Sequence, residues 1–207
     1  MTAAPGWLRE LVTATSDLSA DQLSRQVPPP PESARPSAVL VLFGESNGQP
    51  DLVFIERAHD LRSHAGQLAF PGGSADDGET AVQTALRESQ EEIGLDPAGV
   101  EVLGELPALW LPPTNFAVTC VLAWWREEST VSVVDPLEVA AVLRVPLTEL
   151  VDPGQRVTVV HPLGHRGPGF VVGDLVLWGF TAAVVDRVLQ HAGLAEPWDR
   201  SRTVPAP

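Results

Sequence analysis

The sequence contains no lysine. All 13 of its basic residues are arginine, against 27 aspartate and glutamate residues, and the formal net charge is −14 at pH 7. An acidic chain offers no electrostatic surface for nucleic acid, and it repels polyphosphates unless a metal ion and local arginines intervene. The charge therefore argues against a nucleic-acid partner and, for any phosphate ligand, in favour of a metal site.

Cysteine and long apolar runs are also scarce. The single cysteine, Cys120, excludes an intramolecular disulfide and provides no zinc-binding pattern, which favours a reducing compartment. Because Cys120 stands in an apolar segment, we interpret it as a small buried hydrophobe. No run is long enough to span a membrane, and residues 1–16 lack the apolar core of a signal peptide. We expect a cytoplasmic protein with no membrane partner.

The length of 207 residues and the hydrophobic fraction of 44% suit one domain with a sizeable core. We expect an N-terminal helical segment and proline-rich linker at 1–32, the main domain at 33–194, and a loose tail at 195–207. Apolar residues at helical spacing predict a docking face near the start of the chain: Trp7, Leu8, Leu11 and Val12, then Leu18 and Leu23, before the prolines 28–31.

Residues 81–93 carry the clearest helix pattern. Thr80 can cap its start, Gln83 completes a capping box, and Gly94 supplies the stop. At about 100° per residue, one stripe faces the core and three glutamates group on the roughly opposite side. The stripe is Val82, Leu86, Ser89 and Ile93, and the glutamates are Glu88, Glu91 and Glu92.

Apolar runs and turn residues predict the remaining elements. Strands are expected at 38–43, 51–56, 100–109, 117–125, 138–145, 157–160 and 170–172. The first two strands form a hairpin through 45–50, and the last two form another. A second long helix follows Gly179 and buries Ala182, Val185, Val188 and Leu189.

The glutamates of the 81–93 helix need an explanation. Side chains three or four positions apart on a helix lie about 5–6 Å from each other, so each glutamate pair would repel by on the order of 3 kcal/mol at an effective dielectric near 20. A divalent cation reverses that sign, because hard ions take oxygen ligands and keep other positions for water and substrate phosphates. A solvated acidic face is the alternative, and it is the commoner one for glutamate-rich helices in general.

The spacing around the helix favours the metal. The chain from residue 73 to residue 95 resembles the Nudix box, the signature of hydrolases of nucleoside diphosphates linked to another group. The matching residues are Gly73, Glu79, Arg87, Glu88, Glu91, Glu92, Gly94 and Leu95. Ser89 departs from the box, which usually has an aliphatic residue there, but it lies on the core stripe and leaves the metal face unchanged.

The resemblance implies roles for these residues. Glu88, Glu91 and Glu92 would bind Mg²⁺ or Mn²⁺, with the Gly73 carbonyl as a further ligand. Arg87 would orient the glutamates, and it is placed for an ion pair with Glu91 at the next turn.

The preceding segment, 57–73, resembles an additional motif of the coenzyme A pyrophosphatase branch of the Nudix family. The matching residues are Arg57, Ala58, Arg62, Gly66 and the run Phe70-Pro71-Gly72-Gly73. The branch usually has two aliphatic residues and a threonine just before the motif. Val53-Phe54-Ile55 keeps the aliphatic part and loses the threonine. The segments 114–125 and 178–182 also resemble this branch, and we interpret 178–182 as packing.

This second resemblance implies that Arg57, Arg62, His64, Gly66 and Phe70 bind the substrate. The arginines suit the phosphates of coenzyme A, because guanidinium forks match phosphate oxygens; the alternative is an ion pair with a surface carboxylate. For His64, a local hydrogen-bonding role is the alternative to acid or base catalysis. Outside the box, Glu138 is the candidate for completing the metal site or acting as base, in competition with Asp135 and Glu105.

Together these observations predict an α/β Nudix fold, with a mixed β-sheet sandwiched between helices (α/β/α). The implied reaction is hydrolysis of the pyrophosphate bond of coenzyme A or a derivative to adenosine 3′,5′-bisphosphate and 4′-phosphopantetheine. Two alternatives remain open: a Nudix hydrolase acting on ADP-ribose or a nucleoside triphosphate, and a non-catalytic nucleotide-binding module. A homodimer is also left open.

Overall fold

The computed structural model describes residues 3–15, 19–20, 29–61 and 63–207. Its central element is a hairpin of β1 (Arg35–Ser46) and β2 (Gln49–Arg57), paired from Phe43 with Leu52 to Ser46 with Gln49. Asn47 and Gly48 form the two-residue loop with φ angles of 53° and 74°, the left-handed conformation that tight hairpins require. The predicted hairpin is therefore confirmed.

The hairpin belongs to a mixed sheet with the order β3-β2-β1-β7-β5. In addition, β4 pairs with β1, β6 with β7 and β8 with β2. Only the β1–β7 pair is parallel among these pairings of described residues. The remaining strands are β3 (Leu68–Ala69), β4 (Gly72–Ser74), β5 (Val100–Glu105), β6 (Leu109–Leu111), β7 (Phe116–Trp125) and β8 (Val139–Pro146).

The strand predicted at 100–109 is wrong in one respect, because it is divided into β5 and β6. The Leu106 backbone still donates a hydrogen bond to the Cys120 carbonyl at 2.9 Å, so the break follows immediately after it. Pro107 has no N–H to donate and cannot continue the ladder. Cys120 itself is 1% exposed, as expected of a small buried hydrophobe.

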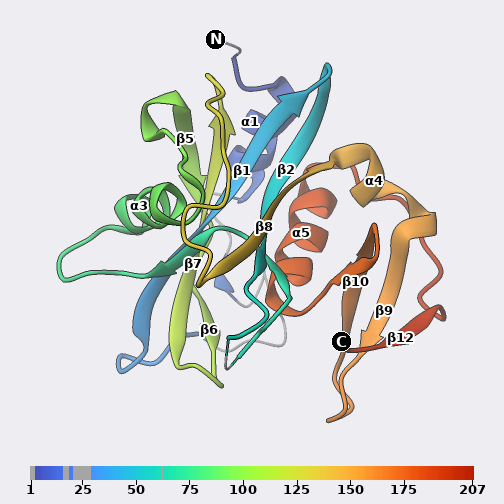
Figure 1. Ribbon diagram of the computed structural model, residues 1–207. Coiled ribbons are helices and arrows are strands. Elements are labelled where there is room, and N and C mark those ends of the chain that lie inside the picture. The colour runs from blue at the N-terminus through green and yellow to red at the C-terminus, as the bar shows by residue number, and fades with distance from the viewer. Residues whose placement is uncertain (1–2, 16–18, 21–28, 62) are drawn as a thin grey trace.

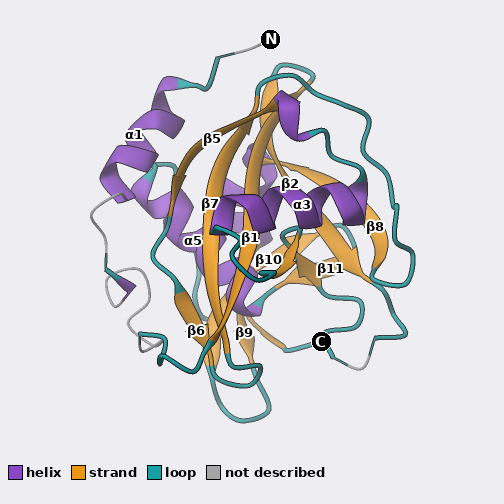
Figure 2. Ribbon diagram, turned by 90° about the vertical axis from the view of Figure 1, so that its left-hand side faces the viewer, coloured by secondary structure: helices purple, strands orange, loops and turns teal. Residues whose placement is uncertain are grey.

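Both faces of the sheet are buried, which explains the continuous apolar runs of its central strands. Helix α3 (Ala81–Ile93) covers one face, while α1 (Gly6–Thr15) and α5 (Gly179–His191) lie on the other (Figures 1 and 2). Alternate residues of β1 and β2 join two cores. Leu40, Leu42, Val53 and Ile55 pack with Ala85 and Ile93 of α3, whereas Val41, Phe43, Leu52 and Phe54 pack with Leu8 and Leu11 of α1 and Val185 and Leu189 of α5.

The helix predictions hold where the structure describes them. Leu8 and Leu11 are fully buried and Trp7 meets Phe43 edge-on at 5.5 Å, which confirms the docking face. Leu18, Leu23 and Pro28 lie outside the described residues. All four residues expected on the inner face of α5 are 0–2% exposed. No helix in the described part of the chain is long and apolar enough to cross a membrane.

A second, four-stranded sheet was not predicted as such. After α4 (Leu147–Val151), β9 (Arg156–Val160), β10 (Arg166–Val172), β11 (Leu175–Leu177) and β12 (Thr203–Pro205) form a sheet of order β11-β10-β9-β12. Figure 1 shows α5 between this sheet and the large one. Short 3-10 turns at Pro97–Gly99 and Pro153–Gln155 lead into β5 and β9. The α/β class is correct, but the fold has two sheets.

The loose tail expected at 195–207 is also a wrong prediction. Strand β12 pairs in parallel with β9, from Thr203 opposite Thr158 to Pro205 opposite Val160. The Arg156 guanidinium lies 4.7 Å from the Trp198 ring and 4.1 Å from the Phe170 ring, and it forms a buried ion pair with Asp186. The tail is therefore held by a sheet ladder and by stacking on a buried cation.

Candidate active site

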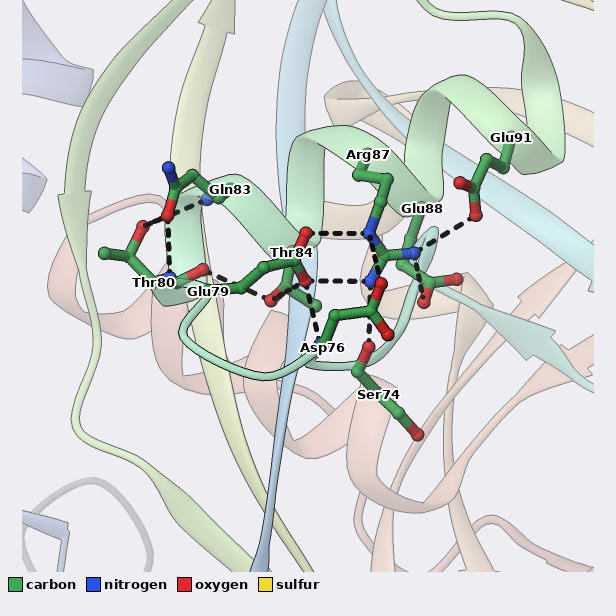
Figure 3. Close-up of polar contacts among 9 residues, drawn as sticks. All are labelled: Ser74, Asp76, Glu79, Thr80, Gln83, Thr84, Arg87, Glu88 and Glu91. Carbon is green, nitrogen blue, oxygen red and sulfur yellow. Dashed lines mark hydrogen bonds and ion pairs between the residues drawn. The ribbon is translucent and has the colours of Figure 1, made fainter.

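The helix α3 begins and ends where the sequence predicts. The Gln83 backbone donates to the Thr80 hydroxyl at 3.3 Å, and the Thr80 backbone donates to the Gln83 side chain at 2.9 Å (Figure 3). Gly94 adopts a φ of 70°, and its N–H donates to the Gln90 carbonyl at 2.9 Å. These contacts fix the helix ends and with them the direction of every side chain between.

Arg87 is the centre of the polar contacts drawn in Figure 3. It donates to both Glu79 carboxylate oxygens at 2.8 and 2.9 Å and to the Ser74 carbonyl at 2.9 Å. It also donates to Glu88 at 3.0 Å and to Glu91 at 3.1 Å, so the predicted Arg87–Glu91 ion pair is present. Hydrogen bonds from Arg87 are the main reason that the pKa of Glu79 falls to about 2. Arg87 thus ties the loop before α3 to the carboxylates on it.

Glu88 and Glu92 both lie against the glycine turn that precedes this loop. The Gly72 N–H donates to the Glu92 carboxylate at 3.0 Å. A Cβ atom at Gly73 would come within 2.5 Å of the Glu88 carboxyl carbon, so the carboxylate lies directly against this glycine. Burial raises the pKa of both carboxyls, that of Glu92 to about 8. Glu92 is 3% exposed, and its buried Oε1 has no hydrogen-bond partner in the part of the chain that the structure describes.

This burial corrects the expected helix faces. Helical periodicity predicts that Glu92 lies with the outward glutamates and that Val82 and Leu86 belong to the core stripe. Both apolar residues are only partly buried, whereas Glu92 is buried beside Ser89 and Ile93. The reason is that strand β4 lies along α3 and covers the side on which Glu92 stands.

The predicted metal ligands do not form a complete coordination site in this arrangement of side chains. Within the described residues, no three His, Cys, Asp or Glu side chains converge on one point. The Glu91 side chain is 60% exposed and directed to Arg87. The Gly73 carbonyl accepts a hydrogen bond from the Ser37 hydroxyl at 2.6 Å, and Gly73 also pairs with Ala38 in the ladder between β4 and β1.

A cavity of about 410 Å³ opens beside this turn. Glu88, Gly73 and Glu138 line it, together with Arg57 and His64. Of the three carboxylates considered as base, Glu138 alone belongs to this lining. Asp135 instead accepts the Leu137 N–H at 2.9 Å and shapes the turn before β8, and Glu105 is exposed on β5. The structure therefore brings one carboxylate from outside the box to the face of α3.

Residues 34–161 match the NUDIX domain. The chain belongs to the Nudix family. It is 35% identical over 168 residues to the uncharacterized Nudix hydrolase NudL of Escherichia coli O7:K1, covering 77% of this chain and 84% of that protein. The NudL of Shigella flexneri serotype 5b is 34% identical over 192 residues, or 88% of this chain and 96% of that protein. The crystal structure of RenU, a Nudix hydrolase of M. smegmatis, has the same fold, with a TM-score of 0.52 and 20% identity over 77% of this chain and 86% of that one.

The protein is thus a Nudix pyrophosphohydrolase. Nudix hydrolases generally use divalent cations such as Mg²⁺ or Mn²⁺ and act on small-molecule pyrophosphates. In this Nudix hydrolase, the chemistry of the donor set fits such an ion. Glu88 and Glu92 are carboxylates held beside a backbone carbonyl, and no described residue forms a hydrogen bond with the buried Glu92 Oε1.

The loop before the Nudix box closes on itself and on β8. The Gly66 N–H donates to the Arg57 carbonyl at 3.0 Å, and the Ala58 N–H donates to the Glu138 carbonyl at 2.8 Å. Gly66 has a φ of 67°, so it makes the turn but does not line the cavity. His64 lines the cavity and lies 3.0 Å from the Gln67 side chain, the local contact considered as its alternative role.

Two other residues were expected to bind the substrate, Phe70 and Arg62. Phe70 is 2% exposed and stacks on Phe54 at 5.2 Å, so it forms part of the cavity wall chiefly by core packing. Arg62 lies outside the described residues. Conversely, Phe180 and Thr181 of α5 line the cavity although the 178–182 segment was interpreted as packing alone. The resemblance of that segment to the coenzyme A branch is the signal that could have indicated them.

Proposed function

We propose that this Nudix hydrolase cleaves the pyrophosphate bond of coenzyme A or its derivatives. The observation that carries the proposal is Arg57, at the end of β2, which lines the same cavity as Glu88 and Glu138. Among the described residues, Arg57 forms no ion pair, and its buried Nε has no hydrogen-bond partner. A guanidinium in that state beside a carboxylate face is suited to a phosphate ligand.

The cation would be held by Glu88, Glu92 and the Gly73 carbonyl, and by Glu91 once it leaves Arg87. A bound divalent cation supplies neutralisation of the phosphate charge and activation of the attacking water. Arg87 keeps Glu88 and Glu91 oriented from the side of the Glu79 loop. Hydrogen bonds to Glu79, and to a lesser extent to Glu88, raise the pKa of Arg87, so it stays charged at any working pH.

Glu138 is our candidate for the base. Glu138 lines the cavity and forms no ion pair with any described arginine. Its negative charge also contributes to the raised pKa of both Glu88 and Glu92. In the reaction, the oxygen of water forms a new bond to one phosphorus while the bridging P–O bond breaks. Glu138 accepts the proton that the water loses, and the departing phosphate leaves as an anion.

The choice of coenzyme A rests on the 57–73 motif. Arg57 is held at the cavity by the loop hydrogen bonds of Ala58 and Gly66, which are motif residues themselves. Arg62, from the same motif, remains a second phosphate ligand predicted from the sequence. The products would be adenosine 3′,5′-bisphosphate and 4′-phosphopantetheine.

A substrate panel with product identification tests this proposal. Purified enzyme is given coenzyme A, ADP-ribose and a nucleoside triphosphate with Mg²⁺ or Mn²⁺, and with a chelator as the metal-free control. We expect kcat/KM for coenzyme A to exceed the other two values by at least about tenfold, which corresponds to about 1.4 kcal/mol. Release of no 4′-phosphopantetheine, with ready cleavage of ADP-ribose, would leave a Nudix hydrolase of another specificity. No cleavage of any compound would favour a binding module.

A further inference from the structure

A second cavity, of about 440 Å³, adjoins the first. It lies between β6 of the large sheet, the β9–β10 hairpin of the small sheet and the helix α5. Leu111 and Phe180 line both cavities, so the two spaces share a wall. Its volume falls within the range of about 300–1,000 Å³ that is usual for small-molecule sites.

The floor of this second cavity is apolar and aromatic. Leu109 and Val184 are 4% and 2% exposed and form its base. The rings of His161 and Trp178 form one side, with centroids 6.3 Å apart and planes 30° apart. His161 is held in place because its Nδ1 accepts the Leu163 N–H at 3.2 Å. Flat aromatic walls over an aliphatic base are suited to a heteroaromatic ring.

The rim of the cavity is basic. His165 and Arg166 at the start of β10, and Arg187 of α5, belong to its lining. No described aspartate or glutamate lines it, although the chain has 27 of these residues and a net charge of −14. Arg166 and Arg187 form no ion pair in the described part of the chain, and Arg187 donates only to the neutral Gln190 at 3.1 Å. Two such guanidinium groups indicate an anionic ligand.

We propose that this second cavity binds the 3′-phosphorylated adenosine half of the substrate, with the base on the aromatic floor and the 3′-phosphate at Arg166 and Arg187. This inference rests on the proposed function, because it takes the pyrophosphate to lie in the first cavity. The pantetheine arm is uncharged and would leave both arginines without a partner. An adenosine 3′-phosphate matches the apolar floor and the basic rim together.

The test compares coenzyme A with dephospho-coenzyme A, which lacks only the 3′-phosphate. Arg166→Ala and Arg187→Ala should each raise KM for coenzyme A by about tenfold with kcat nearly unchanged, since a charge-assisted contact to bound substrate is lost. For dephospho-coenzyme A, the same variants should change KM by less than about twofold. Arg9→Ala is the matched control, because Arg9 is a surface arginine paired with Glu101 and distant in sequence from every cavity residue. Equal losses on both substrates would overturn the inference while leaving the proposed function intact.

A binding measurement separates the two proposals without turnover. In titration calorimetry without metal, wild-type protein should bind adenosine 3′,5′-bisphosphate at least about tenfold more tightly than AMP, and Arg166→Ala and Arg187→Ala should remove that difference. This result would support the cavity even if coenzyme A were not hydrolysed. A preference for AMP, or a difference that survives both substitutions, would overturn it.

A cavity-filling variant, Ala183→Phe, gives a further test. If it weakened the binding of long-chain acyl-coenzyme A alone, the cavity would hold the acyl arm, and the inference would be overturned.

Discussion

The two adjoining cavities differ in how the chain builds them. The wall of the first also comes from several segments, but its α3 face is one continuous stretch, 72–95, whose carboxylates are fixed by local hydrogen bonds to Arg87 and to the glycine turn. The second is assembled from three segments far apart in the sequence, near 109–113, 159–168 and 178–187. One is acidic and close to the reacting bond in the proposed function, and the other is basic and remote from it. We infer that the first determines whether hydrolysis occurs and the second determines on which nucleotide.

That division predicts distinct kinetic signatures. A change on the α3 face should lower kcat for every pyrophosphate, because it removes an interaction with the transition state. A change at the basic rim should raise KM for one class of substrate, because it removes binding that is uniform along the reaction. The following substitutions test the comparison from its strongest effect to its weakest.

The largest loss is expected for Glu88→Gln and Glu92→Gln. Each removes one anionic oxygen ligand and keeps the helix, so kcat should fall by roughly 100-fold or more on all substrates at saturating Mg²⁺. Steady-state kinetics and thermal unfolding would be measured on both variants. Glu10→Gln, on the exposed surface of α1, is the control and should behave like wild type. Near-normal kcat in both active-site variants would contradict the metal assignment.

An intermediate loss is expected for Arg57→Ala. If Arg57 contacts the pyrophosphate itself, kcat/KM should fall by about 10- to 150-fold, from the loss of about 1.5–3 kcal/mol in a charge-assisted contact. The loss should be the same for coenzyme A and dephospho-coenzyme A, in contrast to the rim arginines. Parallel kinetics with both compounds, and with Arg9→Ala as control, would check this. A loss confined to coenzyme A would mean that Arg57 contacts the 3′-phosphate, and the division between the cavities would have to be redrawn.

The smallest effect is expected for Ser89→Ala, on the core side of the same helix. Ser89 is fully buried, and its hydroxyl donates to the Ala85 carbonyl at 2.6 Å, an oxygen already within the helix ladder. Removing that hydroxyl should change the free energy of unfolding by less than about 1 kcal/mol and leave kcat unaltered. Denaturant unfolding and turnover would be compared with wild type. A fall in kcat comparable to that of Glu88→Gln would show that packing under α3 controls the carboxylate geometry.

The helix and its ends were predictable because their determinants are local. Thr80, Gln83 and Gly94 act within one turn of the residues they cap, and the Nudix box is a fixed spacing on that helix. The burial of Glu92 was not predictable from helical period alone. It depends on β4, which reaches α3 only after the chain has folded back along β1. Glu79 was recognised as a box position, but its two-oxygen contact with Arg87 is a tertiary interaction across the loop.

The second sheet and its cavity were harder to predict, because they depend on contacts between segments that are distant in the sequence. Residues 203–205 are too few, and too close to prolines, to carry a strand pattern, and they become a strand only because β9 offers an open edge. The basic rim likewise combines Arg166 and Arg187, which are separated in sequence by the rest of β10, by β11 and by the first part of α5. The hairpin of 157–160 and 170–172 was predicted, although its second strand begins earlier, at Arg166, inside the expected loop. The inner face of α5 was predicted correctly, but the contact of these elements with β6 has no sequence signal.

The pairing of β1 has a consequence for motion. One edge of β1 is shared, with β2 along 43–46 and β4 along 37–39, while its other edge is occupied by β7. The Leu40 N–H also donates to the Pro71 carbonyl at 2.8 Å. The glycine turn can therefore move away from β1 only if the middle of the large sheet opens. Its backbone amides should accordingly exchange with solvent deuterium about as slowly as those of the core strands, on the timescale of global unfolding.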